Sequence, residues 1–533
     1  MAFNYLSLGS NADWKKLEDR LAVDQANPHI AGMIVTRLRE LGALSVLVED
    51  DYLDRDFSEA YSAYYSTTFR RHTKLCTRLL FFGNDISFVN ATADAEELSN
   101  KLEASSFLGQ VVLRPISQAP VSQALLAAPP APASHEGYLL VRSKHTYHVW
   151  GAELSVEGVP MTQQDSRVGA CAQATIWVAA RHFHQRHRGP WLSTVSITRA
   201  ALAQSEAHTN LMLPAGSESL TVNNMVAALR AAGREPLIYY AASPQAWGAV
   251  RPYDIINRYV DSGIPVIVGL TFPNQPVGHA VVATGQVFRL TAPAAFPPNP
   301  TRAEYLEALY VNDDQIGPNI RVGLRQGSAL NEAHYTIEEN ASYLIIPLPG
   351  KVYLPAEKAE ALSWSNLRSY AADWPAFQAK HQAKLGGGSI PLGDDFVAKL
   401  AANEVVARTY LTYGWKYKRR GLRNRLSNPV RQVILNLETP RFVYVTEFAT
   451  LDDTTGRTQF DRRIQAHSVV DATAKNQGAD SVLFLNAPGF CAWHSHDKNG
   501  IFQRSVAPIA DSATYYPKAR GDVDFAKFKL SQF

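Results

Sequence analysis

The chain has 533 residues, of which 46% are hydrophobic and 19% are charged. This length is several times that of a typical domain, so we expect about two to four domains with cores of their own. The 52 basic and 49 acidic residues leave a formal net charge of +3. Such a balance excludes a general electrostatic attraction to nucleic acid or to an anionic membrane, and partners must be inferred from local features.

The three cysteines, Cys76, Cys171 and Cys491, are far apart and form no CxxC pair. This sparse and odd-numbered use argues against a disulfide framework and favours a reducing compartment. The first residues, MAFNYLSLGSNADWKK, lack the positive region and apolar core of a signal peptide. No run approaches the roughly 18 apolar residues that a membrane helix needs. We therefore expect a cytoplasmic protein with no membrane partner.

Residues 1–150 alternate helical and strand-like patterns, which predicts an N-terminal α/β domain whose role the sequence leaves open. Trp14, Leu17 and Leu21 fall at helical spacing, and a second helical run ends before Gly42, which suits a C-cap. Further patterns predict strands at 45–48, 75–82 and 110–114 and a helix at 93–102. The Ala- and Pro-rich segment 125–134 predicts a loop or a domain boundary.

Residues 350–533 are predicted to form a C-terminal α/β domain that is helical first and β-rich later. The pattern predicts a helix at 356–384, a flexible break at 385–393, and a long helix from Asp394 to about Tyr413. Short alternating or apolar runs predict strands at 442–448, 468–470 and 482–485. The residues with chemical potential lie between these two parts, at 151–349.

Cys171 follows small residues and precedes an apolar pattern with i, i+3, i+4 and i+7 spacing from Ile176 to Phe183, the buried face of a helix. Gly189-Pro190 is a strong stop signal for that helix. Cys171 therefore lies at or near the helix N-terminus, where the backbone N–H groups and the macrodipole stabilise a thiolate nucleophile. Taken alone, a cysteine among small residues is more often a buried apolar side chain.

His279 opens a predicted strand at 278–285 (GHAVVATG), which follows another predicted strand at 265–270 (PVIVGL). A histidine at a strand start, beside a loop bearing proline and glycine, is well placed to face a cleft and act as a base. A surface or core-capping role is the commoner fate of one histidine among 15. The Gly-His-Ala-Val-Val context nevertheless favours a catalytic interpretation.

A third segment, 309–318 (LYVNDDQIGP), is predicted as a strand that runs into an acidic turn. A carboxylate there could accept the other imidazole N–H, fix the tautomer of the ring and favour the imidazolium. Asp313 is the first candidate and Asp314 the alternative. The ordinary structural explanation is an Asn-Asp-Asp turn that satisfies its own backbone.

In their order and context these three segments resemble the papain-like cysteine peptidase superfamily, and most closely bacterial double-glycine leader peptidases. The resemblance covers about residues 158–349. It implies an α/β (α+β) fold in which a papain-like catalytic domain at 151–349 is flanked by the two other regions. It also implies a Cys171, His279 and Asp313 triad that acts on a protein or peptide substrate without cofactor or metal.

The family places its oxyanion-hole glutamine six residues before the cysteine, where this chain has Asp165. Gln164 lies seven residues before Cys171 and Gln163 eight, so an insertion in the loop is needed for either amide to reach the oxyanion. We favour Gln164 because it needs the smaller insertion, and Gln163 stays a close alternative. A missing oxyanion donor typically costs about 3 kcal/mol of barrier stabilisation.

The resemblance implies acyl transfer through a thioester, so the expected reaction is cleavage of a peptide or amide bond by a cysteine hydrolase. An acyltransferase of the same fold is chemically close. The displaced glutamine motivates a different class, a catalytically inactive papain-like protein that binds or scaffolds.

Two other groups of residues could suggest a nucleic-acid partner or a metal site, but each has a simpler structural explanation. The basic run at 416–425 (KYKRRGLRNR) is read as a solvated helix end, so a nucleic-acid partner is not expected. A zinc site made of His467, Cys491, His494 and His496 is not expected either, because strand histidines without CxxC or HxxxH spacing are weak evidence for a metal.

Overall fold

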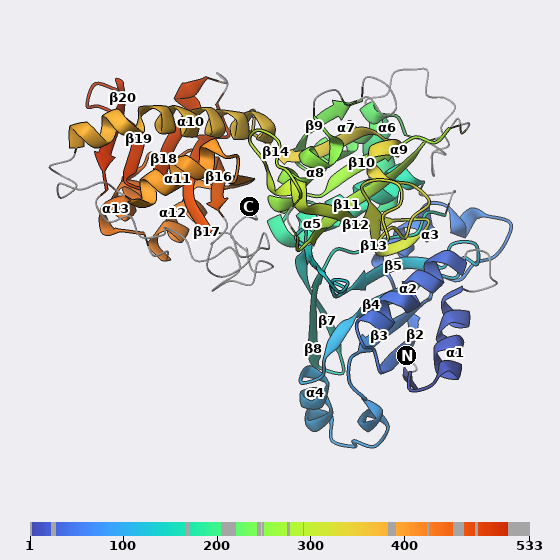
Figure 1. Cartoon of the computed structure of the whole chain (residues 1–533). Coiled ribbons are helices and arrows are strands. Elements are labelled where there is room, and N and C mark those ends of the chain that lie inside the picture. Colours follow the sequence, from blue (N-terminus) through green and yellow to red (C-terminus); the bar gives the residue numbers. More distant parts are fainter. Residues whose placement is uncertain are drawn as a thin grey trace.

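The computed structural model describes residues 3–22, 28–165, 170–203, 220–241, 247, 250–273, 275, 278–291, 293–381, 391–423, 426–450, 463–474 and 478–509. Three antiparallel sheets of five, seven and six strands are each combined with helices, and one two-stranded hairpin is separate. The N-terminal part lies below the central part, and the C-terminal part lies to its left (Figure 1). The predicted mixed α+β fold with several domains is confirmed.

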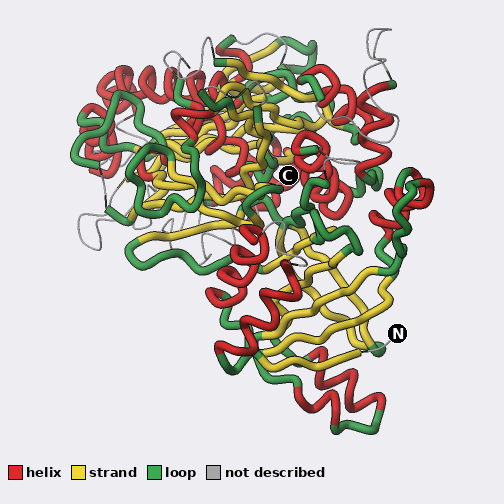
Figure 2. Tube along the Cα trace, turned by 90° about the vertical axis from the view of Figure 1, so that its right-hand side faces the viewer, coloured by secondary structure: helices red, strands yellow, loops and turns green. Residues whose placement is uncertain are grey.

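The N-terminal sheet has the strand order β1-β2-β3-β4-β5. Its strands are β1 (Phe3–Ser7), β2 (Ser45–Tyr52), β3 (Cys76–Phe82), β4 (Phe107–Leu113) and β5 (Val121–Leu126), and its helices are α1 (Asn11–Ala22), α2 (Pro28–Glu40), α3 (Arg55–Ala63) and α4 (Ala95–Glu103). Side chains alternate across β2, so Val46 and Val48 pack with α1 and α2 while Leu47 packs with α4. Helices thus lie on both sides of the sheet (Figure 2).

The central sheet has the order β13-β12-β11-β10-β14-β9, and β6 pairs with β11 outside that path. Its strands are β6 (His135–Leu139), β9 (Arg234–Tyr240), β10 (Val266–Leu270), β11 (His279–Arg289), β12 (Leu306–Asp313), β13 (Gly317–Gly323) and β14 (Ala341–Pro349). Its helices are α5 (Cys171–His187), α6 (Thr194–Leu202), α7 (Val222–Ala231), α8 (Pro252–Asp261) and α9 (Ile337–Asn340). The predicted strands that carry His279 and Asp313 are confirmed as β11 and β12.

The chain does not pass cleanly from the N-terminal to the central part at residue 150. Strand β6 precedes that position and pairs with β11 of the central sheet, from Leu139 opposite Gly285 to His135 opposite Arg289. The chain then returns toward the N-terminal part through the hairpin of β7 (Ser143–Val149) and β8 (Ala152–Gly158). Leu154 of β8 packs in the cluster that covers the N-terminal sheet. The two parts are therefore joined by several crossings of the chain.

The C-terminal sheet is a meander in the order β15-β16-β17-β18-β19-β20, and α10 runs along it (Figure 1). Its strands are β15 (Val406–Tyr413), β16 (Phe442–Thr450), β17 (Arg463–Asp471), β18 (Val482–Ala487), β19 (Phe490–His496) and β20 (Phe502–Pro508). Its helices are α10 (Ala356–His381), α11 (Pro391–Ala401), α12 (Gly414–Arg423) and α13 (Asn428–Asn436). Among the described residues this region begins with two helices and ends in five consecutive strands.

The predicted long helix from Asp394 to Tyr413 is wrong. Helix α11 ends at Ala401, Asn403 adopts a left-handed φ of 58°, and β15 begins at Val406. A left-handed residue breaks the helical path, and the β-branched and aromatic residues that follow are typical of a strand. Of the predicted flexible break at 385–393, residues 385–390 lie outside the described residues, and 391–393 belong to α11. None of the helices in the described ranges is long and apolar enough to cross a membrane.

Candidate functional site

Cys171 is the first residue of α5, a 17-residue helix of the central part. The Ala170 backbone N–H donates to the Gln173 side-chain oxygen at 3.3 Å, which caps the first turn. Ile176 and Trp177 of the same helix are buried in the main core, while Cys171 itself is half-buried against that core. The thiol therefore lies at the N-terminus of a firmly packed helix, as predicted. The preceding residues 166–169 lie outside the described part of the chain.

His279 is the first residue of β11, and it pairs with Leu270 at the end of β10. A Cβ added at the preceding Gly278 would lie 2.7 Å from the Leu270 carbonyl oxygen, closer than real Cβ contacts come. Glycine at 278 therefore lets the two strand ends approach. This close approach is a local reason that glycine precedes His279 at the start of the strand.

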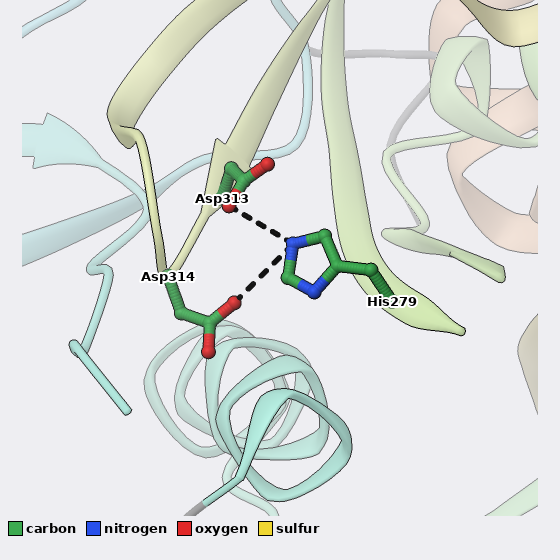
Figure 3. A group of neighbouring side chains, drawn as sticks. All are labelled: His279, Asp313 and Asp314. Carbon is green, nitrogen blue, oxygen red and sulfur yellow. Dashed lines mark hydrogen bonds and ion pairs between the residues drawn. The ribbon is translucent and has the colours of Figure 1, made fainter. Parts of the chain in front are cut away.

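Asp313 ends β12 and lies directly beside His279, with 3.0 Å between the imidazole Nε2 and the Asp313 Oδ1 (Figure 3). The same Oδ1 accepts the Gln315 backbone N–H at 2.8 Å, and the other carboxylate oxygen accepts the Tyr335 hydroxyl at 2.7 Å. Asp313 is completely buried. These three contacts, together with burial, hold the side chain in a single orientation, facing the imidazole.

The other ring nitrogen, Nδ1, lies 3.4 Å from the Gln315 side-chain nitrogen. The Cys171 thiol is within hydrogen-bonding reach of the same imidazole. Burial by itself would lower the pKa of His279, but hydrogen bonds with Asp313 and Cys171 and the nearby carboxylate charges raise that pKa to about 11. Burial would raise the pKa of Asp313, and its hydrogen bonds and the His279 charge lower it instead. The pair is therefore an imidazolium and a carboxylate.

Asp314 also faces the imidazole, with 3.6 Å between its Oδ1 and Nε2 (Figure 3). Both of its carboxylate oxygens are buried and have no hydrogen-bond partner among the described residues. Burial raises the pKa of Asp314 to about 7, and the neighbouring Asp313 charge contributes to this rise. Within the described ranges, His279, Asp313 and Asp314 are the one group of three potential metal ligands, with ligand atoms within 4.8 Å of one another.

The two glutamines that precede Cys171 differ in their surroundings. Gln163 is buried, its side-chain oxygen accepts the Val121 backbone N–H at 3.0 Å, and its carbonyl accepts from Arg114. That amide therefore joins the loop to the N-terminal sheet. Gln164 is half-buried, and no described contact joins it to Cys171. Residues 166–169, which lie between Gln164 and Cys171 in the chain, are outside the described residues. The role of Gln164 therefore stays a prediction.

Asp165, six residues before Cys171, has a structural role. Its carboxylate accepts the Tyr65 hydroxyl at 2.6 Å and lies 4.0 Å from the Arg114 guanidinium. Both partners come from the N-terminal part, so Asp165 joins that part to the loop before Cys171. The side chain at 165 therefore serves this link between the two parts of the chain.

Three residues that contribute to the site belong to no motif by which the sequence could have identified them. Tyr335 anchors Asp313 from 22 positions further along the chain, and Gln315 lies beside the ring. Tyr343 of β14 is close enough to Cys171 for a thiolate charge to raise its pKa, with burial as the larger cause of a rise to about 12. Its ring covers Gly269, where an added Cβ would meet ring atoms at 2.1 Å. These side chains come together because of how the strands and loops of the central part are arranged in space, which the spacing of residues in the sequence does not predict.

The remaining candidates stay apart from this site. His467 is buried in β17 and hydrogen-bonds the Tyr417 hydroxyl at 2.9 Å, and His494 contacts the Val482 carbonyl. Cys491 is buried in β19 and burial raises its pKa. Burial likewise raises the pKa of Cys76 to about 12.

Comparison of the chain with protein-family models, with curated proteins and with solved structures gives no significant match.

Proposed function

We propose that the chain is a cysteine hydrolase that cleaves peptide or amide bonds, with a papain-like central domain. The observation that carries this proposal is the arrangement around His279. One ring nitrogen is 3.0 Å from a fully buried Asp313 carboxylate, and the Cys171 thiol at the start of α5 is within reach of the ring. A nucleophile, a base and a group that orients the base are the elements of such catalysis.

In the proposed reaction the Cys171 thiolate attacks the carbonyl carbon of the substrate. The carbonyl π electrons move to oxygen, and the tetrahedral intermediate collapses to a thioester as the His279 imidazolium protonates the leaving amine. Neutral His279 then takes a proton from water, which attacks the thioester and releases the acid and the Cys171 thiolate. Asp313 stabilises the imidazolium throughout, and Tyr335 holds Asp313 in position.

The oxyanion would be stabilised by the Cys171 backbone N–H at the start of α5 and by the side-chain amide of Gln164. Gln163 is the poorer choice because its side chain already accepts from Val121 in the structural link described above. We expect Gln164→Ala to lower kcat by roughly 100-fold or more if this amide faces the oxyanion. Gln163→Ala serves as the matched control for an effect on the loop alone.

The three free thiols support the further proposal of a reducing, cytoplasmic compartment. The substrate class we propose is a protein or peptide.

The second candidate function, an inactive binding protein of the same fold, is favoured by one observation. Asp165 stands at the family's glutamine position and is tied to Tyr65, so it cannot donate to an oxyanion.

Labelling of Cys171 with iodoacetamide or an epoxide probe at neutral pH separates the two functions. An active site should alkylate at Cys171, and the site of modification can be read by mass spectrometry of peptides. His279→Ala should abolish the fast reaction, whereas His496→Ala, a change of an exposed histidine in β19, should leave it unchanged. An inert Cys171 in a correctly folded protein would refute the hydrolase and leave the binding function.

A further inference from the structure

The Asp314 carboxylate is the anomaly of the site. Its two oxygens are buried without a hydrogen-bond partner among the described residues, although Asp313 beside it accepts several hydrogen bonds. A buried carboxylate without a hydrogen-bond partner is unfavourable, so in folded proteins it is paired with a charge, protonated or bound to a metal ion. Its Oδ1 lies 3.6 Å from Nε2 of His279, within ion-pair distance but too far for a hydrogen bond.

The distances at this position fit a small divalent cation. The imidazole Nε2 lies 3.0 Å from the Asp313 Oδ1 and 3.6 Å from the Asp314 Oδ1. Around a tetrahedral Zn²⁺ with bonds of about 2.1 Å, neighbouring ligand atoms lie about 3.4 Å apart. The two observed distances bracket that value, and the three side chains converge in Figure 3.

The groups around the three ligands also have the character of a metal site. Metal-bound carboxylates and imidazoles are usually held by further hydrogen bonds that fix their orientation. Here Asp313 is held by the Tyr335 hydroxyl and the Gln315 backbone N–H, and Gln315 also lies beside the Nδ1 of His279. Two carboxylates and one imidazole, once the imidazole has given up its Nε2 proton, offer the oxygen and nitrogen ligands that Zn²⁺ accepts.

We propose that His279, Asp313 and Asp314 bind one Zn²⁺ or similar divalent cation, and that this cation holds the hydrolase in an inactive state. The cation takes the lone pair of Nε2 and releases its proton to solvent. With Nε2 bound to the cation, the one remaining ring proton lies on Nδ1, so His279 can take no proton from the Cys171 thiol and the thiolate–imidazolium pair does not form. Cys171 is not a ligand in this arrangement. The regulatory half rests on the proposed function, whereas the binding half depends only on the three ligands.

The test is calorimetric titration of the full chain with Zn²⁺, together with metal content after desalting. We expect one Zn²⁺ per chain in the wild type and the same affinity in Cys171→Ala. Asp314→Asn should bind at least about 100-fold more weakly, because it loses a direct ligand. Asp254→Asn is the matched control, since its carboxylate pairs with Arg251 and is not among the three ligands. Circular dichroism checks that each variant is folded.

Two results would overturn the cation site. One is the absence of micromolar Zn²⁺ binding by both the wild type and Cys171→Ala, an outcome that does not depend on the folding of Asp314→Asn. The other is loss of binding in Cys171→Ala, which would mean that the thiol holds the metal. Alkylation of Cys171 in metal-free protein tests the hydrolase separately. If Zn²⁺ binds but leaves that alkylation rate unchanged, the cation site stands and its regulatory role is refuted.

Discussion

The two adjacent aspartates Asp313 and Asp314 should respond in opposite directions to the same change, Asp→Asn, in the metal-free protein. Asp313 is the counter-ion of the buried His279 imidazolium and accepts the hydroxyl of Tyr335. Asp314 is equally enclosed but accepts no hydrogen bond among the described residues. Asp313→Asn should therefore destabilise the central domain, and Asp314→Asn should stabilise it at neutral and alkaline pH.

The magnitudes follow from these surroundings. Asp313→Asn leaves a buried cation without its partner, which costs about 3–5 kcal/mol in comparable buried pairs. For Asp314, burial raises the pKa from 3.8 to about 7. At about 1.4 kcal/mol per pKa unit, keeping this group ionised in the folded state costs as much as about 4 kcal/mol. The asparagine amide is also buried without partners, so we expect a gain of about 2–4 kcal/mol.

The sign of the pH dependence is fixed by the direction of that shift. Because the folded protein binds a proton on Asp314 more tightly than the unfolded chain does, stability falls as the pH rises from about 4 to about 7. Asp314→Asn removes this loss. Its stabilising effect should be near zero at about pH 4 and complete at about pH 8.

Urea unfolding in EDTA at both pH values measures the change in free energy. Hydrogen–deuterium exchange of peptides from β11 and β12 assigns the change to the central domain, since a chain of several domains need not unfold in one step. The reasoning is refuted if Asp314→Asn destabilises these strands at about pH 8 as much as Asp313→Asn does. A stabilisation that is equal at both pH values would refute the titration of Asp314 as its cause.

Three further outcomes are expected. Tyr335→Phe should cost about 1–2 kcal/mol of stability and slow alkylation of the reactive thiol, because Asp313 loses the hydroxyl that orients it. Glu360→Gln should destabilise the contact between α8 and α10 by about 3–5 kcal/mol in urea unfolding, because it leaves Arg258 of a buried 2.5 Å pair uncompensated. A thiol count with Ellman's reagent should give one fast cysteine in the native protein and three in denaturant, since the other two are buried; two fast thiols in the native protein would contradict that packing.

The local elements of the site could be predicted from sequence because their signals are local. The helix that begins at Cys171 is marked by its apolar spacing and its stop signal, and the strand of His279 by an uninterrupted apolar run. The prediction of one long helix over 394–413 is wrong because the helical pattern near Asp394 ends at Ala401 and does not continue into β15. A single left-handed residue, Asn403, separates the two elements; asparagine favours that conformation after a helix, and this stop signal in the sequence was missed.

The sequence by itself determined the candidate nucleophile, the candidate base and the acidic turn, since each has its own short-range context. Only the tertiary structure decided that β11 and β12 pair, with Val282 opposite Asn312, and so bring His279 within 3.0 Å of Asp313. It also distinguished the two aspartates, one held by Tyr335 and one without a hydrogen-bond partner among the described residues. The physical reason is that strand register and burial depend on residues far away in the chain, whereas spacing reports only on neighbours.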